Sequence, residues 1–189
     1  MEEKNLEKIL NQLGLGGRIF AVKSLVGKVN LAEHHVNEAI EYYEKEERFE
    51  DAAYIAVKAG KREKAKELLG KVYKNYLEKL KMASSYAFSA EYFVNSAKNF
   101  IELALEFGMV DEVINFYEKA NKLEKAADLA YKNNKREKAA DLYKKIIENY
   151  AGLGNFKKAA EIAYKAGWPE KAKDLEYLSN LINEKNKKY

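Results

Sequence analysis

Few residues in this chain have the types and spacings that catalysis or metal binding requires. The only histidines are His34 and His35, and the stretch Glu33-His34-His35-x-x-Glu38 places His34 and Glu38 one helical turn apart. One helix could therefore offer two metal ligands. A metal site needs at least a third ligand, and the sequence holds no second histidine cluster and no cysteine. We interpret the pair as surface or hairpin-facing histidines and keep a metal site as an alternative.

Other catalytic patterns are incomplete. The segment Gly14-x-Gly16-Gly17-Arg18 resembles a phosphate-binding loop in its glycine content, but it follows a helical pattern instead of a strand and lacks the Gly-Lys-Ser/Thr ending. A helix end and linker is the simpler interpretation. There is no Gly-x-Ser-x-Gly motif, and the absence of cysteine removes thiolate nucleophiles and disulfides. We therefore expect neither catalysis nor a bound cofactor.

Charge is unevenly distributed along the chain. Lysine and arginine total 34 against 30 aspartates and glutamates, a net charge of +4, and the excess lies entirely after residue 108. Segment 38–51 is acidic, whereas segment 58–81 is basic and includes Tyr73 and Tyr76. The basic segment could contact phosphates and stack on bases, so nucleic-acid binding is one alternative. The simpler interpretation is that it packs against the acidic segment of the same unit.

The elements that would position these residues are helices nearly throughout. Apolar residues recur at helical spacing, no segment alternates as a half-buried strand does, and there is only one proline. After a first helix ending near Leu13, helical runs are expected at about 18–28, 31–46, 49–59, 62–82, 85–107, 110–120, 123–133, 136–150, 155–166 and 169–184. Gly60, Gly108 and Gly167 end runs, and Pro169 begins one. Connections this short predict antiparallel neighbours and an all-α fold.

An internal repeat organises the chain. Segments 49–68, 123–142 and 156–175 align without gaps, at offsets of 74 and 33 residues. Small residues recur in register on the first helix of each unit: Ala52, Ala53 and Ala56; Ala126, Ala127 and Ala130; Ala159, Ala160 and Ala163. Such a small-residue face lets a neighbouring helix approach closely. The sequence thus predicts stacked helical hairpins.

The middle of the chain departs from this pattern. Tyr86, Phe93, Phe100 and Phe107 recur every seven residues. This spacing predicts one long central helix over 83–108 with a buried aromatic spine. A slot for a small ligand, lined by these rings, is the alternative.

The repeated pattern Ala-Ala-x-x-Ala-x-Lys-x-Gly/Asn-x-x-Glu-Lys-Ala-x-x-Leu resembles the tetratricopeptide and tetratricopeptide-like repeats, including those of SNAP adaptors and coat-type α-solenoids. It covers about 36–69 and 110–184; Val72 and Ile146 stand where that family usually has alanine. The resemblance implies a right-handed superhelix of about 10–11 antiparallel helices. We expect a single domain, 1–189, with a helical cap (1–30), repeat regions (31–82 and 109–184), the central helix (83–108) and a frayed tail (185–189).

The resemblance also implies a function. In tetratricopeptide-like arrays the first helix of each hairpin lines a concave groove that binds a partner helix or an extended peptide. The corresponding exposed residues here are Glu50, Asp51, Tyr54, Lys58, Lys125, Asp128, Tyr131, Lys132, Lys157, Lys158, Glu161, Tyr164 and Lys165. The carboxylate-clamp pattern of some family members is not reproduced, because Glu124 and Asp128 are acidic. We expect a non-catalytic, cytoplasmic protein-interaction module without a membrane-spanning segment.

Overall fold

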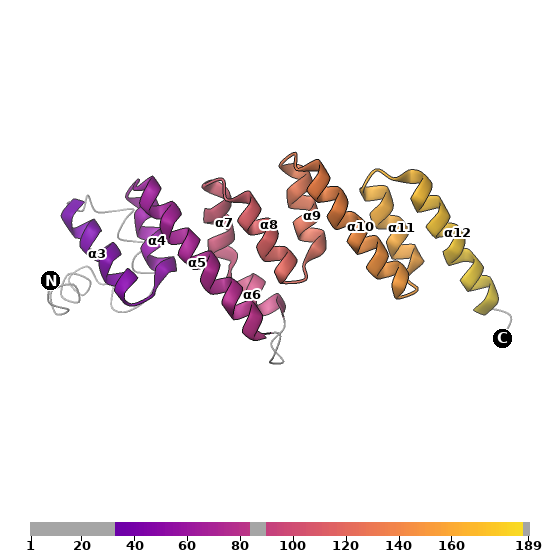
Figure 1. The fold of residues 1–189 in the computed structure, drawn as a ribbon, viewed down its shortest axis with the longest axis horizontal. Coiled ribbons are helices and arrows are strands. Elements are labelled where there is room, and N and C mark those ends of the chain that lie inside the picture. The colour runs from indigo at the N-terminus through magenta and orange to yellow at the C-terminus, as the bar shows by residue number, and fades with distance from the viewer. Residues whose placement is uncertain (1–32, 84–89, 187–189) are drawn as a thin grey trace. The chain divides into compact units, whose positions relative to one another are not determined.

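The computed structural model describes residues 33–83 and 90–186, which form ten α-helices and no strand (Figure 1). The expected cap (1–30) lies outside the described residues, as do 187–189 of the expected tail. The chain divides into two compact units, 1–108 and 109–189. No helix among the described residues is both long and apolar enough to cross a membrane.

The first unit contains five described helices. They are α3 (Glu33–Lys45), α4 (Phe49–Lys58), α5 (Arg62–Ala83), α6 (Ala90–Ser96) and α7 (Lys98–Glu106). Helix α4 packs between α3 and α5, and α5 also packs against α6 and α7. The first three helices begin and end close to their expected bounds.

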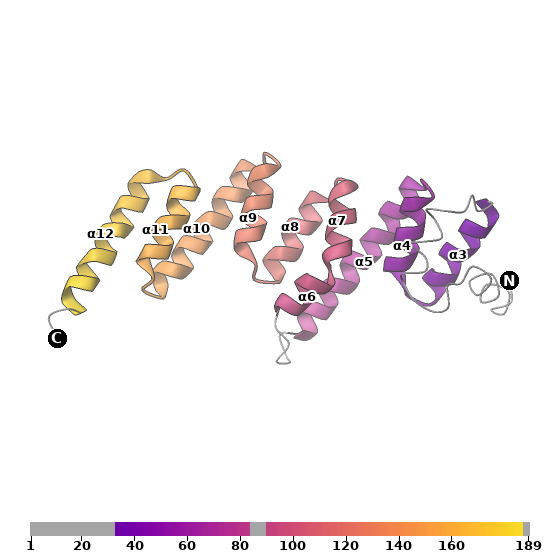
Figure 2. The ribbon, with the colours of Figure 1, turned by 180° about the vertical axis from the view of Figure 1, so that it is seen from behind.

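The second unit contains α8 (Val110–Lys119), α9 (Leu123–Lys132), α10 (Arg136–Gly152), α11 (Phe156–Lys165) and α12 (Pro169–Asn186). Each helix packs against the next one in sequence, which confirms sequential helix-pair packing. Figures 1 and 2 show these helices side by side in chain order from the two sides.

Alanines make this close packing possible. The repeated alanines of α9 and α11 are fully or almost fully buried in one hydrophobic cluster with Leu142, Ile146 and Ile147 of α10. A methyl group leaves room for the neighbouring helix, and a larger side chain there would overpack the interface. The small-residue face expected from the repeat is thus confirmed.

The turns between hairpin helices use the left-handed backbone region. Gly60 and Gly167 have φ values of 70° and 77°, and Asn134 occupies the equivalent position with φ 59°. After the second of these glycines, Trp168 N–H donates a 2.9 Å hydrogen bond to the Ala163 carbonyl, which closes α11, and Pro169 begins α12. The expected helix ends and the expected role of the single proline are confirmed.

The prediction of one long helix over 83–108 is wrong, because this range contains α6 and α7, separated by Ala97. The Tyr76 hydroxyl of α5 donates a 2.9 Å hydrogen bond to the Ser96 carbonyl, which an unbroken helix would offer to its own backbone. The Ser96 hydroxyl also donates to the Phe93 carbonyl, at 2.9 Å. The interruption is local, since Ala97 N–H still donates to Phe93 O at 2.9 Å.

At Phe100 the aromatic spine is a packing feature. Phe100 is fully buried, and its ring centroid lies 5.7 Å from that of Tyr76 and 6.3 Å from that of Tyr73. Phe93 and Phe107 are only partly buried, and Tyr86 lies outside the described residues. At Phe100 the rings of α5 and α7 therefore fill the space that a ligand slot would need.

Candidate interaction surface

An ion pair joins the first helices of two successive repeats in the second unit. The Lys165 ammonium of α11 lies 2.7 Å from the Asp128 carboxylate of α9, although α10 separates the two helices in sequence. Both residues were expected on a binding groove, and the structure brings them together. Helical spacing places their neighbours beside them. We call this surface the α9–α11 face; it comprises Glu124, Asp128, Tyr131, Lys132, Lys157, Lys158, Glu161, Tyr164 and Lys165.

Two tyrosines of α10 donate hydrogen bonds to carboxylates of this face. The Tyr143 hydroxyl donates a 2.9 Å hydrogen bond to Asp128, and the Tyr150 hydroxyl donates one of 3.1 Å to Glu124. Burial, together with the neighbouring carboxylates, raises the pKa of both phenols, so both remain protonated donors. The two carboxylates are therefore held in fixed positions by residues of the next helix.

Two cations of the face are not paired with any acidic residue that the structure describes. Asp128 is paired with Lys165, and Glu161 is paired with Lys158 at 3.0 Å. By contrast, Lys132 and Lys157 are exposed and form no ion pair with any residue that the structure describes. The outer side of α10 differs, because Asp141 and Glu148 are exposed there beside Lys144. The face thus offers cations to a partner, whereas the outer side offers both signs.

Two exposed tyrosines add aromatic surface. Tyr131 and Tyr164 stand at the same repeat position and are 47% and 46% exposed. The Arg136 guanidinium lies 4.3 Å from the Tyr131 ring centroid, and the Tyr164 hydroxyl donates a 3.2 Å hydrogen bond to Glu176. Tyrosines that keep about half their surface exposed beside cations are typical of protein-binding surfaces.

The remaining expected residue of the second unit lies to one side of this face. Lys125 is exposed, and its ammonium lies 5.8 Å from the ring centroid of Tyr117 on α8. The Lys125 side chain therefore extends toward α8, away from α11. The Lys165 side chain of α11, by contrast, extends toward α9. We do not include Lys125 in the α9–α11 face.

In the first unit, α4 carries the other four expected residues. Glu50 accepts a 3.2 Å hydrogen bond from the Tyr76 hydroxyl, which repeats the Glu124–Tyr150 contact at an offset of 74 residues. Asp51 pairs with Arg48 at 2.7 Å. The Lys58 ammonium lies 5.5 Å from the Tyr54 ring centroid. Of these four residues, only Lys58 is fully exposed, and the other three are partly buried.

The basic helix α5 packs against the acidic segment, as the simpler interpretation predicted. Lys64 and Lys71 lie 2.7 Å and 2.6 Å from the Glu44 carboxylate of α3. Partial burial alone would raise the pKa of Glu44, but hydrogen bonds and attraction from both lysines outweigh it and lower that pKa. Two cations of the proposed nucleic-acid site are therefore already neutralised. The others that are exposed are Arg62, Lys66, Lys74, Lys79 and Lys81.

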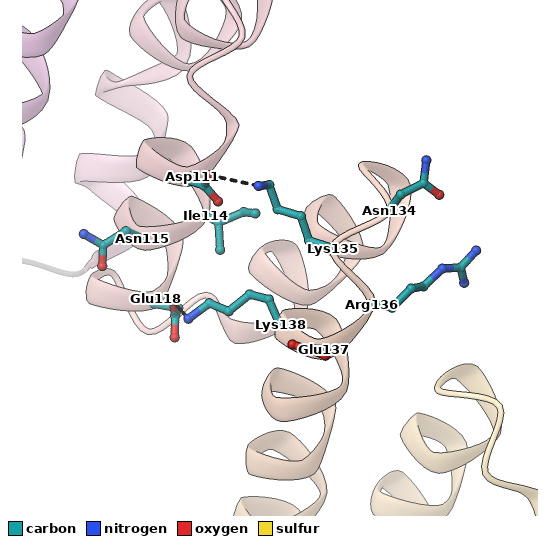
Figure 3. A pocket seen from close by; sticks show the side chains of 9 residues that line it. All are labelled: Asp111, Ile114, Asn115, Glu118, Asn134, Lys135, Arg136, Glu137 and Lys138. Carbon is teal, nitrogen blue, oxygen red and sulfur yellow. Dashed lines mark hydrogen bonds and ion pairs between the residues drawn. The ribbon is translucent and has the colours of Figure 1, made fainter.

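A hollow that the sequence did not predict recurs in both units. In the second unit it lies between α8 and the start of α10, where Lys135 pairs with Asp111 at 2.9 Å and Lys138 pairs with Glu118 at 2.6 Å (Figure 3). A hollow in the first unit is lined by the equivalent residues 74 positions earlier: Asn37, Ile40, Glu41, Glu44, Lys61, Arg62, Glu63 and Lys64. The signal available in the sequence was the identical Lys-Arg-Glu-Lys at 61–64 and 135–138. Three of its four lysines, Lys64, Lys135 and Lys138, form ion pairs with carboxylates of α3 or α8.

The histidine alternative lies at the edge of the described region. His34 and His35 fall in the first turn of α3, and their side chains are outside the described ones. Among the residues that are described, no group of three or more histidine, cysteine, aspartate or glutamate side chains is placed to hold a metal ion.

No protein-family model, no curated protein and no solved structure matches this chain.

Proposed function

We propose that this chain is a non-catalytic interaction module, a tetratricopeptide-like right-handed superhelix that binds a partner helix or extended peptide along the first helices of its repeats. Support comes from the three aligned repeats and from the sequential packing of α8 to α12. In the second unit, the residues that would bind a partner are those of the α9–α11 face. In the first unit, taken by itself, the equivalent residues lie on α4.

The observation that carries the proposal is the Lys165–Asp128 ion pair. It joins α9 and α11 on the side where Tyr131 and Tyr164 are exposed, so aromatic surface from two successive repeats lies on one face. The cations left unpaired there, Lys132 and Lys157, suit a partner segment that carries negative charge. A partner would then be recognised by packing against Tyr131 and Tyr164 and by attraction between its negative charge and the two lysines.

Charge reversal at the unpaired cations tests this proposal. In the double variant Lys132→Glu/Lys157→Glu, the capture of partners from native lysate should fall at least tenfold, because attraction becomes repulsion. Lys158 and Lys165 are unsuitable targets, since reversing them would also break ion pairs within the chain.

A matched control comes from exposed lysines of the same unit that are not part of the α9–α11 face. Lys119 and Lys144 are also exposed lysines without an ion pair to the described residues, and Lys119, like Lys132, lies in the last turn of its helix. The variant Lys119→Glu/Lys144→Glu makes the same change in net charge and should leave capture unchanged. Equal losses in both variants, or none in either, would contradict binding at the α9–α11 face.

A further inference from the structure

The last helix carries an apolar stripe that no described element covers. Tyr177 of α12 is 65% exposed, Leu178 41%, Leu181 38% and Ile182 40%. Their spacing along the helix places them on one side of it. Figure 1 shows α12 in yellow at the C-terminal end of the second unit, with α11 as its neighbour. We call these four residues the α12 stripe.

Comparison with the preceding repeat shows that the stripe is specific to α12. The positions 33 residues earlier on α10 are all polar and exposed: Lys144, Lys145, Glu148 and Asn149. The buried side of α10 shows the opposite difference. Its buried residues Tyr143, Ile146 and Ile147 correspond to the polar residues Glu176, Ser179 and Asn180 of α12. A hairpin stacked on α12 in the register of the earlier ones would therefore meet polar side chains.

We propose that the α12 stripe docks antiparallel against α12 of a second copy of this chain. A two-fold axis between Leu178 and Leu181 sets each of these leucines opposite the other leucine of the second copy. It likewise sets Tyr177 opposite Ile182. The stripe is thus complementary to itself, as an isologous interface requires.

Charges at the two ends of the stripe specify the antiparallel direction. Lys173 and Glu184 are exposed and lie three helical turns apart on the same edge of α12. Antiparallel docking brings Lys173 of each copy beside Glu184 of the other, whereas parallel docking would place these edges on opposite sides of the interface and form neither pair. Within its own chain Lys173 lies 3.4 Å from Glu170, but both side chains are mostly exposed, so this pair contributes little and can exchange.

The size of the stripe indicates a reversible dimer. Four side chains exposed to this degree amount to apolar surface on the order of a few hundred Å² per copy. Two stripes together fall below the roughly 1,200 Å² at the low end of specific interfaces, so the dimer should be weak. Association should therefore depend on protein concentration.

Sedimentation velocity of the full chain over a range of concentrations tests the proposal. The average mass of the wild type should rise from one chain toward two. The variant Leu178→Glu/Leu181→Glu should stay monomeric at concentrations at least tenfold higher, with its helical circular-dichroism signal unchanged. A wild type that is monomeric from the micromolar to the millimolar range would overturn the proposal.

Charge exchange supplies a second test that does not depend on apolar residues. Lys173→Glu alone and Glu184→Lys alone should each weaken association at least tenfold. The double variant should recover it, and so should an equimolar mixture of the two single variants, because each restores two opposite-charge pairs. Failure of both the double variant and the mixture to recover association would overturn the antiparallel arrangement.

Discussion

The Lys165 ammonium lies 2.7 Å from the Asp128 carboxylate, 37 residues earlier in the chain. This contact links α11 to α9, although α10 lies between them in sequence. The Tyr143 hydroxyl of α10 donates a hydrogen bond to the same carboxylate. One aspartate thus receives a cation from the following repeat and a phenol from its own hairpin. Packing of both helices against α10 sets the relative placement of these two first helices, and the ion pair marks the side on which they lie next to each other. The binding proposal depends on that placement.

The pair should show a measurable coupling energy. In a double-mutant cycle with Asp128→Asn and Lys165→Met, we expect about 0.5–1 kcal/mol, since both side chains are more than a third exposed. Asparagine retains an oxygen that can accept from Tyr143, so the cycle isolates the ion pair. The free energy of unfolding from urea denaturation is the measurement, and additive effects of the two substitutions would show that the contact is not formed in solution.

Close helix packing makes the buried alanines intolerant of larger side chains. Ala130 of α9 is fully buried, and Ala130→Leu should lower the free energy of unfolding by about 1–3 kcal/mol through overpacking. Ala140 of α10 is partly exposed, so Ala140→Leu should change it by less than about 0.5 kcal/mol. Thermal unfolding of the two variants compares them directly, and equal effects would contradict the small-residue interface.

The Glu44 carboxylate should stabilise the first unit only while it is ionised. Its pKa is lowered below 4.5 by Lys64 and Lys71, so its contribution is present above about pH 4.5 and is lost as the pH falls through the lowered pKa. Glu44→Gln should therefore cost about 1 kcal/mol at pH 7 and almost nothing at strongly acidic pH.

Unfolding of the wild type and of Glu44→Gln across this pH range is the measurement. Glu41→Gln on the same helix is the control, because Glu41 is exposed and forms no ion pair with the described residues. A difference between Glu44→Gln and the wild type that stays constant with pH would show that the ion pairs do not cause it.

Substitutions at two turn residues with positive φ should change the stability in opposite directions. Glu47 has a φ of 56°, a region that costs a residue with a side chain about 1 kcal/mol, so Glu47→Gly should stabilise the chain by up to that amount. Gly167→Ala, at φ 77°, should destabilise it by about 1 kcal/mol. Melting temperatures that shift in the same direction for both variants would contradict these turn conformations.

Much of the fold could be predicted from the sequence because the helices are local. Apolar spacing, the glycine positions and Pro169 gave bounds within a few residues for α4, α5 and α8 to α11. The break at Ala97 could not be predicted, since alanine favours helices. At the break the Ser96 carbonyl accepts a hydrogen bond from Tyr76, 20 residues away, and such a contact exists only once α5 and α6 have packed.

The candidate site was predictable only in part. Repeat alignment identified the residues of the first helices, but not which of their charges neutralise one another. Lys165 and Lys132 occupy the same repeat position, but only Lys165 forms an ion pair with a described residue. The α12 stripe was also missed, because each of its residues fits an ordinary helical pattern until it is compared with the polar residues of α10.

Site-specific photo-crosslinking tests the central claim most directly. A photoreactive phenylalanine analogue would replace Tyr131 or Tyr164 on the α9–α11 face, and in a third protein Glu148 on the outer side of α10. The account predicts that the same partner crosslinks at positions 131 and 164 and not at 148. Crosslinking at 148 alone, or equally at all three positions, would contradict it.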